Sequence, residues 1–321
     1  MSMHGRVVTV FGGTGFIGRP LVGALAAHGA RVRVAVRDVE RVSPLKILGD
    51  LGQIAPITAS LTHPDSVHRA VEGADAVVNL VGILSESGRQ TFQSVHVEGA
   101  RTVARAAAQA GVGTLVHMSA LGACADSPAR YAQSKAAGEA AVREAVPQAA
   151  IVRPSVVFGP DDRFFNLFAS FTRFSPVLPY FDRGGSLGSP RFQPVFVGDV
   201  VQAITTLVET PRPGETFELG GPQVYSMREI MELIVRETHR ATRVIKLPFW
   251  VAQTQAALLG RLPNPLLTPD QVLMLQKDNV LSGACPGLEA LGIEPQAVEA
   301  VVPSYLSRFR PLHRHVILRD T

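Results

Sequence analysis

The chain has 321 residues, enough for about two domains or for one large α/β domain with an appendage. Hydrophobic residues make up 46% of it and charged residues 18%, which allows a substantial core and excludes the class of intrinsically disordered proteins. The formal net charge is only +4, which argues against a dedicated nucleic-acid-binding protein. Two cysteines, Cys124 and Cys285, are too few for a disulfide framework or a four-thiolate zinc site, and they favour a reducing compartment.

The first strand-like segment begins at Arg6, so the chain as given leaves no room for a signal peptide or a transit sequence before the fold. No apolar run approaches the roughly 18–20 residues that span a bilayer. A largely apolar run without charged residues, 247–260, has 14 residues and predicts a core or interfacial helix. We therefore expect a cytoplasmic protein.

Short β-branched segments alternate with alanine-rich segments over the first half of the chain. This alternation predicts an α/β fold with a doubly wound parallel sheet that is covered by helices on both faces. The expected strands are residues 7–11, 32–36, 54–58, 76–80, 114–118 and 151–153. The expected helices are residues 16–28, 65–72, 94–110 and 129–145.

The alternation stops after Gly159, where proline, glycine and aromatic residues become frequent. Further along, the pattern predicts strands at 193–197 and 215–219, helices at 199–209 and 227–239, and a helical, proline-broken segment from 247 onward. We therefore predict a sheet domain over residues 1–160. A smaller α+β or helical region over residues 161–321 is expected to be interleaved with the sheet.

A glycine-rich segment joins the first expected strand to the first expected helix and contains Gly-x-Gly-x-x-Gly from Gly13 to Gly18. Glycines in this context permit a tight turn and the close approach of a pyrophosphate, and the helix N-terminus offers unpaired N–H donors. The alternative is a glycine-rich turn that binds nothing. The dinucleotide-binding residues predicted here are Gly12, Gly13, Thr14, Gly15, Phe16, Ile17 and Gly18.

The residue after the second expected strand bears on the choice of nucleotide. Arg37 follows that strand, 19 residues after Gly18, where proteins that bind NAD carry an acidic residue for the ribose. An arginine can pair with a 2′-phosphate, so the sequence favours NADP(H) over NAD(H). The alternative is that Arg37 is a solvated loop residue and that Asp38 binds the ribose.

Three further residues predict a catalytic group. Ser119 follows the strand at 114–118, and Tyr131 and Lys135 are four residues apart on one face of an expected helix. The lysine ammonium can favour the phenolate and hold the cofactor ribose, while the tyrosine exchanges a proton with a substrate oxygen that the serine orients. The alternative is that Tyr131 and Lys135 bind the cofactor without any turnover of substrate.

With the glycine loop, these residues resemble the extended and atypical short-chain dehydrogenases/reductases. The segments 79–82, 153–154 and 195–200 lie where that superfamily places its sheet-edge and substrate-side motifs, so the resemblance adds Asn79, Leu80, Val81 and Pro154 to the nucleotide site. A narrower resemblance is to the family of the NADPH-binding accessory subunit of respiratory complex I. It is carried by the segments 48–53, 95–98, 127–139, 158–164 and 286–292.

This resemblance implies a Rossmann domain with a smaller C-terminal region, tightly bound NADPH, and a position where the peripheral arm of complex I meets its membrane arm. Two departures matter. Ala59-Ser60-Leu61 replaces the acidic residue that extended members often carry near the end of the third strand, so no adenine contact is transferred. The missing presequence indicates a bacterial homologue.

We therefore predict an NADP(H)-binding protein of this type, cytoplasmic or peripheral at the inner membrane. Its partners would be complex I subunits or a membrane surface, contacted through residues 247–321, whose last 18 residues carry a net charge of +3. No nucleic acid and no metal are expected, and His313 and His315 are interpreted as part of the basic tail. The alternative is a soluble NADPH-dependent reductase, epimerase or dehydratase for a small carbonyl or sugar-nucleotide substrate.

Overall fold

The protein is described by a computed structural model over residues 3–185, 188–259 and 267–311. Within these ranges, seven parallel strands form one sheet in the order β11-β6-β5-β4-β1-β2-β3. The strands are β1 (Val7–Phe11), β2 (Arg31–Val36), β3 (Ile54–Thr58), β4 (Ala76–Asn79), β5 (Thr114–Met118), β6 (Ala150–Pro154) and β11 (Thr216–Leu219). The predicted doubly wound sheet is confirmed, and its first six strands begin and end within one residue of the prediction.

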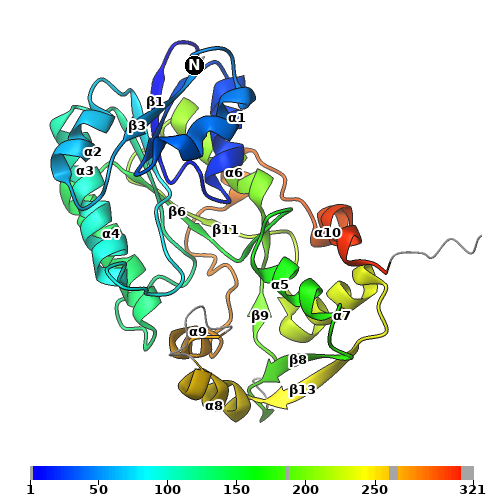
Figure 1. Ribbon diagram of the computed structural model, residues 1–321. Helices are drawn as coiled ribbons and strands as arrows, with labels where there is room; N and C mark the ends of the chain where they lie inside the picture. The colour runs from blue at the N-terminus through cyan, green and yellow to red at the C-terminus, as the bar shows by residue number, and fades with distance from the viewer. Residues whose placement is uncertain (1–2, 186–187, 260–266, 312–321) are drawn as a thin grey trace, which may run out of the picture.

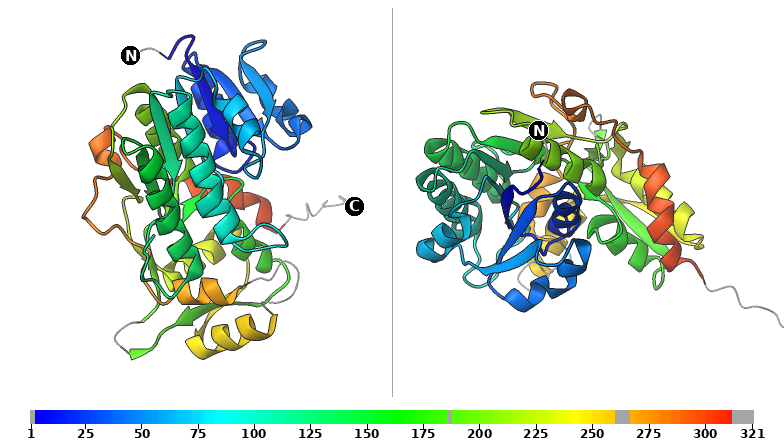
Figure 2. Two further views of the ribbon diagram at one scale, coloured as in Figure 1. Left: turned by 90° about the vertical axis from the view of Figure 1, so that its left-hand side faces the viewer. Right: turned by 90° about the horizontal axis from the view of Figure 1, so that it is seen from above.

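Helices cover both faces of the sheet, as Figures 1 and 2 show. One layer contains α1 (Gly18–Ala27), α6 (Val197–Glu209) and the 3₁₀ segment η1 (Val39–Leu48). The other contains α2 (Pro64–Val71), α3 (Gly99–Gln109) and α4 (Arg130–Ala145). Alternate residues of β1 serve the two layers, because Val8 and Val10 pack in the core beneath α1 and Phe11 packs in the opposite core.

The helix predicted at 94–110 begins with a wider turn. Residues Gln93–Glu98 form a π-helical segment, η2, which continues directly into α3. Such π-helical segments are rare and occur frequently at functional sites. This one places His96 beside α4.

The smaller region contains three two-stranded sheets within the described residues. They pair β7 (Val157–Phe158) with β10 (Val195–Phe196), β9 (Arg191–Phe192) with β12 (Tyr225–Ser226), and β8 (Val177–Asp182) with β13 (Arg243–Pro248). The helices there are α5 (Phe164–Phe171), α7 (Met227–Thr238), α8 (Phe249–Leu259), α9 (Pro269–Met274) and α10 (Val298–Leu306), with 3₁₀ turns η4 (Leu288–Leu291) and η5 (Ser307–Phe309). The strand predicted at 193–197 is wrong, because only Val195–Phe196 is a strand there and α6 already begins at Val197.

The expectation of a helical segment from residue 247 also needs correction. Residues Leu247 and Pro248 end β13, whose partner β8 lies more than 60 positions earlier, so no local pattern could reveal the pair. Helix α8 follows, with Ala252 and Ala256 buried and Trp250 64% exposed. In the described segments no helix is long and apolar enough to cross a membrane.

The structure leaves two expectations open: the domain boundary at residue 160 and the interpretation of the basic tail. β11 and α6 lie beyond residue 160 and yet complete the sheet and one of its helical layers. The domain boundary itself stays a prediction. His313, His315 and the basic tail after Pro311 lie outside the described residues.

Candidate functional site

The glycine-rich turn lies at the carboxyl end of β1, next to the point where the strand order reverses between β1 and β4. Ligands of open α/β sheets bind in the crevice at such a point. Gly12 has φ +81°, and a Cβ there would lie 3.2 Å from the carbonyl carbon of Leu80. A Cβ at Gly18 would collide with the backbone of Gly12 and lie 2.6 Å from the Cα of Gly13. The turn therefore needs glycine for its own conformation and for its contact with α1.

The N-terminus of α1 faces this turn without a local cap. Ile17 occupies the N-cap position, and no side chain within the described residues caps the helix there. Arg19 instead donates from Nε to the carbonyl of Thr14, at 3.0 Å. Unpaired N–H groups and the positive end of the helix dipole make this terminus suited to a phosphate.

Arg37 and Asp38 follow β2 and have different surroundings. Asp38 accepts a hydrogen bond from the N–H of Glu40 at 3.1 Å and so caps η1. Arg37 is exposed and makes no hydrogen bond or ion pair within the described part of the chain. The geometry thus leaves the Arg37 guanidinium available to an anion and engages the Asp38 carboxylate locally.

Asn79 is the last residue of β4, and its side chain links the loop after β4 to β5 through two hydrogen bonds. Its amide nitrogen donates to Nδ1 of His117 at 3.3 Å, while its carbonyl accepts the N–H of Val81 at 3.1 Å. Burial and the charge of Lys135 lower the pKa of His117 to about 3, so this ring is neutral at physiological pH. Leu80 lies against Gly12. Pro154, at the end of β6, accepts the N–H of Leu121 at 2.9 Å.

Ser119 and Lys135 meet at the end of β5. The Lys135 ammonium donates to the carbonyl of Met118 at 3.0 Å, one residue from Ser119. Burial lowers the pKa of Lys135 to about 8, and the carboxylate of Glu139 opposes that shift. The Ser119 hydroxyl is buried and has no hydrogen-bond partner among the described residues. A buried hydroxyl without a partner is costly, which marks it as a group that a ligand oxygen can satisfy.

Tyr131 lies one turn before Lys135 on α4 and is half-buried. Its ring makes edge contacts with Phe92 and His96, at centroid distances of 5.8 and 5.5 Å. Burial raises the pKa of Tyr131 to about 12. The phenol is therefore protonated at neutral pH, as a proton donor must be.

His96 lies at the site although it was not predicted as a site residue. Its Nδ1–H donates to Ser134 Oγ at 2.8 Å, and its Nε2 accepts the N–H of Ile83 at 3.0 Å. Burial, aided by the charge of Lys135, lowers the pKa of His96 to about 3. With both nitrogens engaged, the ring supports Tyr131 instead of carrying protons. Only the resemblance over residues 95–98 pointed to this position.

A second feature that was not predicted is an ion-pair network formed by Glu139, Arg153 and Glu218. Arg153 makes a two-fold contact with the Glu139 carboxylate, at 2.8 and 2.6 Å, and its Nη1 lies 3.8 Å from Glu218. Glu218 in turn accepts from the N–H and hydroxyl of Ser282. The network links α4 to β6, β11 and the later chain behind the site.

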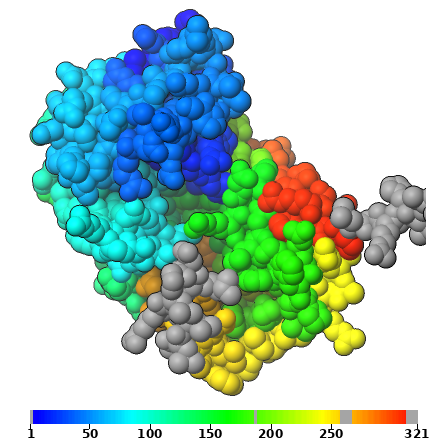
Figure 3. Space-filling view, viewed as in Figure 1, coloured from blue at the N-terminus to red at the C-terminus, as the bar shows by residue number. Residues whose placement is uncertain are grey.

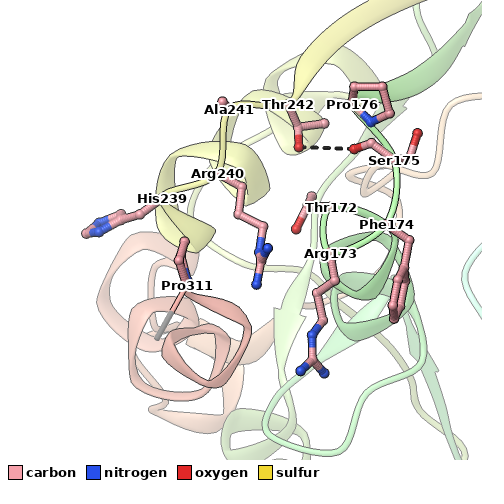
Figure 4. Close-up of a pocket in the computed structure, with 10 residues that line it drawn as sticks. All are labelled: Thr172, Arg173, Phe174, Ser175, Pro176, His239, Arg240, Ala241, Thr242 and Pro311. Atoms are coloured by element: carbon pink, nitrogen blue, oxygen red, sulfur yellow. Dashed lines mark hydrogen bonds between the residues drawn. The ribbon is translucent and has the colours of Figure 1, made fainter. Parts of the chain in front are cut away.

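A surface cavity of about 550 Å³ lies elsewhere, where α5 and α7 end and β8 and β13 begin (Figure 4). Arg173 and Arg240 extend along it, and Arg240 donates from Nε to the carbonyl of Phe309 at 2.8 Å. None of the predicted site residues lines it.

The surface is also hollowed between the N-terminal part, blue and cyan in Figure 3, and the green part of the smaller region. No group of three or more metal-binding side chains occurs in the described ranges.

Known proteins resemble this chain over most of its length. It is 36% identical over 312 residues to NADH dehydrogenase (ubiquinone) 1 alpha subcomplex subunit 9 of Mus musculus, covering 96% of this chain and 82% of that protein. It is 35% identical over 266 residues to the ceramide reductase of Caulobacter vibrioides, covering 82% of this chain and 80% of the relative. The predicted resemblance to the complex I accessory subunit is therefore confirmed.

A solved structure shares the fold at lower identity. The NADPH-dependent quinone oxidoreductase of Escherichia coli, complexed with NADPH, superposes with a TM-score of 0.72 at 17% identity over 93% of this chain and 99% of that one. A family model matches residues 8–220, which include the glycine turn, Tyr131 and Lys135. The chain therefore belongs to the NAD dependent epimerase/dehydratase family.

Proposed function

We propose that the protein binds NADP(H) at the carboxyl ends of β1, β2 and β4, with Tyr131 and Lys135 at the nicotinamide ribose. The observation that carries this proposal is the glycine-lined N-terminus of α1 together with the Arg37 guanidinium after β2, both of which lack a side-chain partner among the described residues. A pyrophosphate matches the first group and a 2′-phosphate matches the second. The remaining contacts proposed along the crevice are Gly12, Gly13, Thr14, Gly15, Phe16, Ile17, Gly18, Asn79, Leu80, Val81 and Pro154.

The nicotinamide end has the right donors. The Lys135 ammonium lies under the loop after β4, since a Cβ on Gly82 would be 3.6 Å from its Nζ. Among the described residues it donates one hydrogen bond, to the carbonyl of Met118, and an ammonium has three donors. Two donors therefore remain for ribose hydroxyls.

Calorimetry with NADPH tests this assignment. Lys135→Ala removes a charged hydrogen bond and should weaken binding about tenfold or more, because such bonds contribute roughly 1.5–3 kcal/mol. Tyr131→Phe removes a neutral hydroxyl and should weaken binding less. The control is Lys277→Ala, an exposed lysine on the smaller region. Wild-type affinity in the Lys135 variant would show that the motif has been assigned wrongly.

A second candidate is catalysis, as an NADPH-dependent reductase, epimerase or dehydratase. The unpartnered Ser119 hydroxyl favours it, because a substrate carbonyl oxygen is the group that such a hydroxyl could orient. Bound NADPH would supply the hydride, and protonated Tyr131 would deliver the proton to that oxygen. Loss of NADPH oxidation in Ser119→Ala and Tyr131→Phe at NADPH concentrations that saturate each variant would support catalysis. Equal activity in all three proteins would exclude these roles.

For the partner, we propose association with complex I subunits, peripheral to the membrane, through the α8 end of the smaller region. Trp250 is 64% exposed there, and exposed aromatic residues are typical anchors of protein interfaces. Similarity to the mouse complex I subunit over 96% of the chain points the same way. Within the described residues, α8 follows the last residue of β13, whereas Pro311 lies beside the residues that precede the first residue of that strand.

A further inference from the structure

Helix α4 carries Tyr131 and Lys135, yet its own sequence does not cap it. Ala129 occupies the N-cap position with extended backbone angles, φ −85° and ψ 121°, and has no side-chain acceptor. The first N–H groups of a helix have no partner within the helix, so an uncapped first turn frays.

The acceptor comes from the smaller region. Asp270, 140 residues after Arg130, accepts the N–H of Arg130 on Oδ1 at 2.6 Å and the N–H of Tyr131 on Oδ2 at 3.0 Å. Each carboxylate oxygen thus holds one backbone donor of the turn that carries Tyr131. The negative charge also lies at the positive end of the α4 dipole, where it is favourable.

Asp270 is the second residue of α9, and that helix is fixed by a cap and by packing. Thr268 and Gln271 form a capping box at the start of that helix. Val272 packs with Ala252 and Ala256 of α8, and these two helices lie together at the lower edge of Figure 1. The carboxylate is therefore presented by a packed helix pair and not by a loose loop.

Other residues also hold the first turn of α4. Ser134 Oγ donates to the carbonyl of Tyr131 at 2.7 Å, and Arg130 pairs with Glu86 at 3.0 Å. The Tyr131 ring rests on Phe92 and His96. Asp270 supplies the two contacts that fix the Tyr131 backbone from the C-terminal part of the chain.

We infer that Asp270 is a positioning residue for Tyr131, so that the nicotinamide end of the site depends on α9. This inference rests on the proposed binding of NADP(H). Under this inference, nucleotide binding at the nicotinamide end is thermodynamically linked to the packing of α8 and α9. Binding at the adenine end, which is built on α1 and β2, does not depend on Asp270.

Two nucleotides separate positioning from a general loss of structure. In full-length Asp270→Ala, the calorimetric affinity for NADPH should fall about three- to tenfold, the range expected when a helix cap is lost. The affinity for adenosine 2′,5′-bisphosphate, which lacks the nicotinamide half, should change less than about twofold. Asp270→Asn keeps one acceptor oxygen and should lie between wild type and the alanine variant.

A rescue and a control complete the design. Ala129→Ser in the Asp270→Ala background places a local acceptor at an N-cap with suitable backbone angles and should restore NADPH affinity. Asp126→Ala removes an exposed carboxylate that precedes α4 and should change neither affinity. Amide hydrogen exchange of residues 130–134 should rise in Asp270→Ala and fall again in the rescued protein.

Unchanged NADPH affinity in Asp270→Ala, or equal loss for both nucleotides, would overturn the inference. Restored exchange protection without restored NADPH affinity would also overturn it, because the cap would then not be the link. If the wild type binds neither nucleotide, the proposed function fails instead. The exchange experiment then decides alone, and unchanged exchange in Asp270→Ala would refute the positioning role.

Discussion

At the scale of the residue, the proposed preference for NADPH over NADH depends on Arg37. Its guanidinium follows β2 without a partner among the described residues, while the adjacent Asp38 carboxylate caps η1. A carboxylate that faced the ribose would repel a 2′-phosphate, whereas this one is engaged by a backbone N–H. This arrangement is the basis of the proposed preference for NADPH.

Arg37→Ala should remove most of the preference for NADPH over NADH. The lost charge-assisted contact is worth about 1.5–3 kcal/mol, or roughly tenfold and upward in affinity for NADPH alone. Arg31→Ala is the matched control, an exposed arginine at the opposite end of the same strand. Calorimetry with both nucleotides gives the preference, and equal wild-type affinities for NADPH and NADH would contradict it.

The proposed contact of Lys135 with the nucleotide predicts that binding depends on pH. The pKa of Lys135 in the folded protein is lowered to about 8, so the ammonium is present below pH 8 and is lost as the pH rises through that value. NADPH affinity should therefore be constant well below pH 8 and fall as the pH rises through 8, by a total that approaches the loss of about tenfold or more expected for Lys135→Ala.

Other groups of the site do not titrate in that window. His96 and His117 have pKa values lowered to about 3, and Tyr131 has one raised to about 12. Lys135→Ala should consequently show little pH dependence between about pH 7 and 9 when affinity is followed by fluorescence titration. A wild-type profile as flat as that of the variant would show that no ammonium takes part in binding.

At the scale of elements, α1 has one glycine at its start and one in its interior, and the two positions differ in the space available for a side chain. Gly18 touches the backbone of the glycine turn, so a side chain has no room there. At Gly23 an added Cβ would lie 3.6 Å from Leu48, an ordinary contact. The same substitution therefore tests the turn at one position and helix propensity at the other.

Gly18→Ala should destabilise the protein by about 1–3 kcal/mol and weaken NADPH binding, because the turn must move away from α1. Gly23→Ala should be neutral or stabilise it by up to about 1 kcal/mol, since alanine is the better helix former. Urea unfolding and NADPH titration of both variants make the comparison. Equal effects of the two changes would mean that the close contact at Gly18 is unimportant.

At the scale of the whole molecule, the smaller region has two exposed aromatic side chains at opposite ends of the β8–β13 pair. Trp250 follows β13 on α8, and Phe174, 86% exposed, precedes β8 beside Arg173. Since the pair is parallel, these residues mark opposite ends of one surface element. This separation allows one end to be tested against the other.

Crosslinking in native cells followed by pull-down should recover complex I subunits with the wild type. Trp250→Ala should reduce that recovery severalfold, because a buried interface tryptophan contributes about 2 kcal/mol or more. Phe174→Ala should leave recovery unchanged. If the wild type recovers no complex I subunit, the reductase candidate becomes the better one.

The alternation of buried β-branched segments and alanine-rich helices was enough to predict the sheet, because strands covered on both faces must be apolar along their whole length. The positions of the glycine turn, Arg37, Ser119, Tyr131 and Lys135 at strand ends or on one helix face could also be predicted from their spacing. Their roles stay predictions.

Only the tertiary structure decided the rest. The pairing of β8 with β13, the support of Tyr131 by His96, and the cap that Asp270 gives α4 all join residues far apart along the chain. Local propensity carries no information on such contacts, because their free energy comes from groups that meet only after the chain has folded.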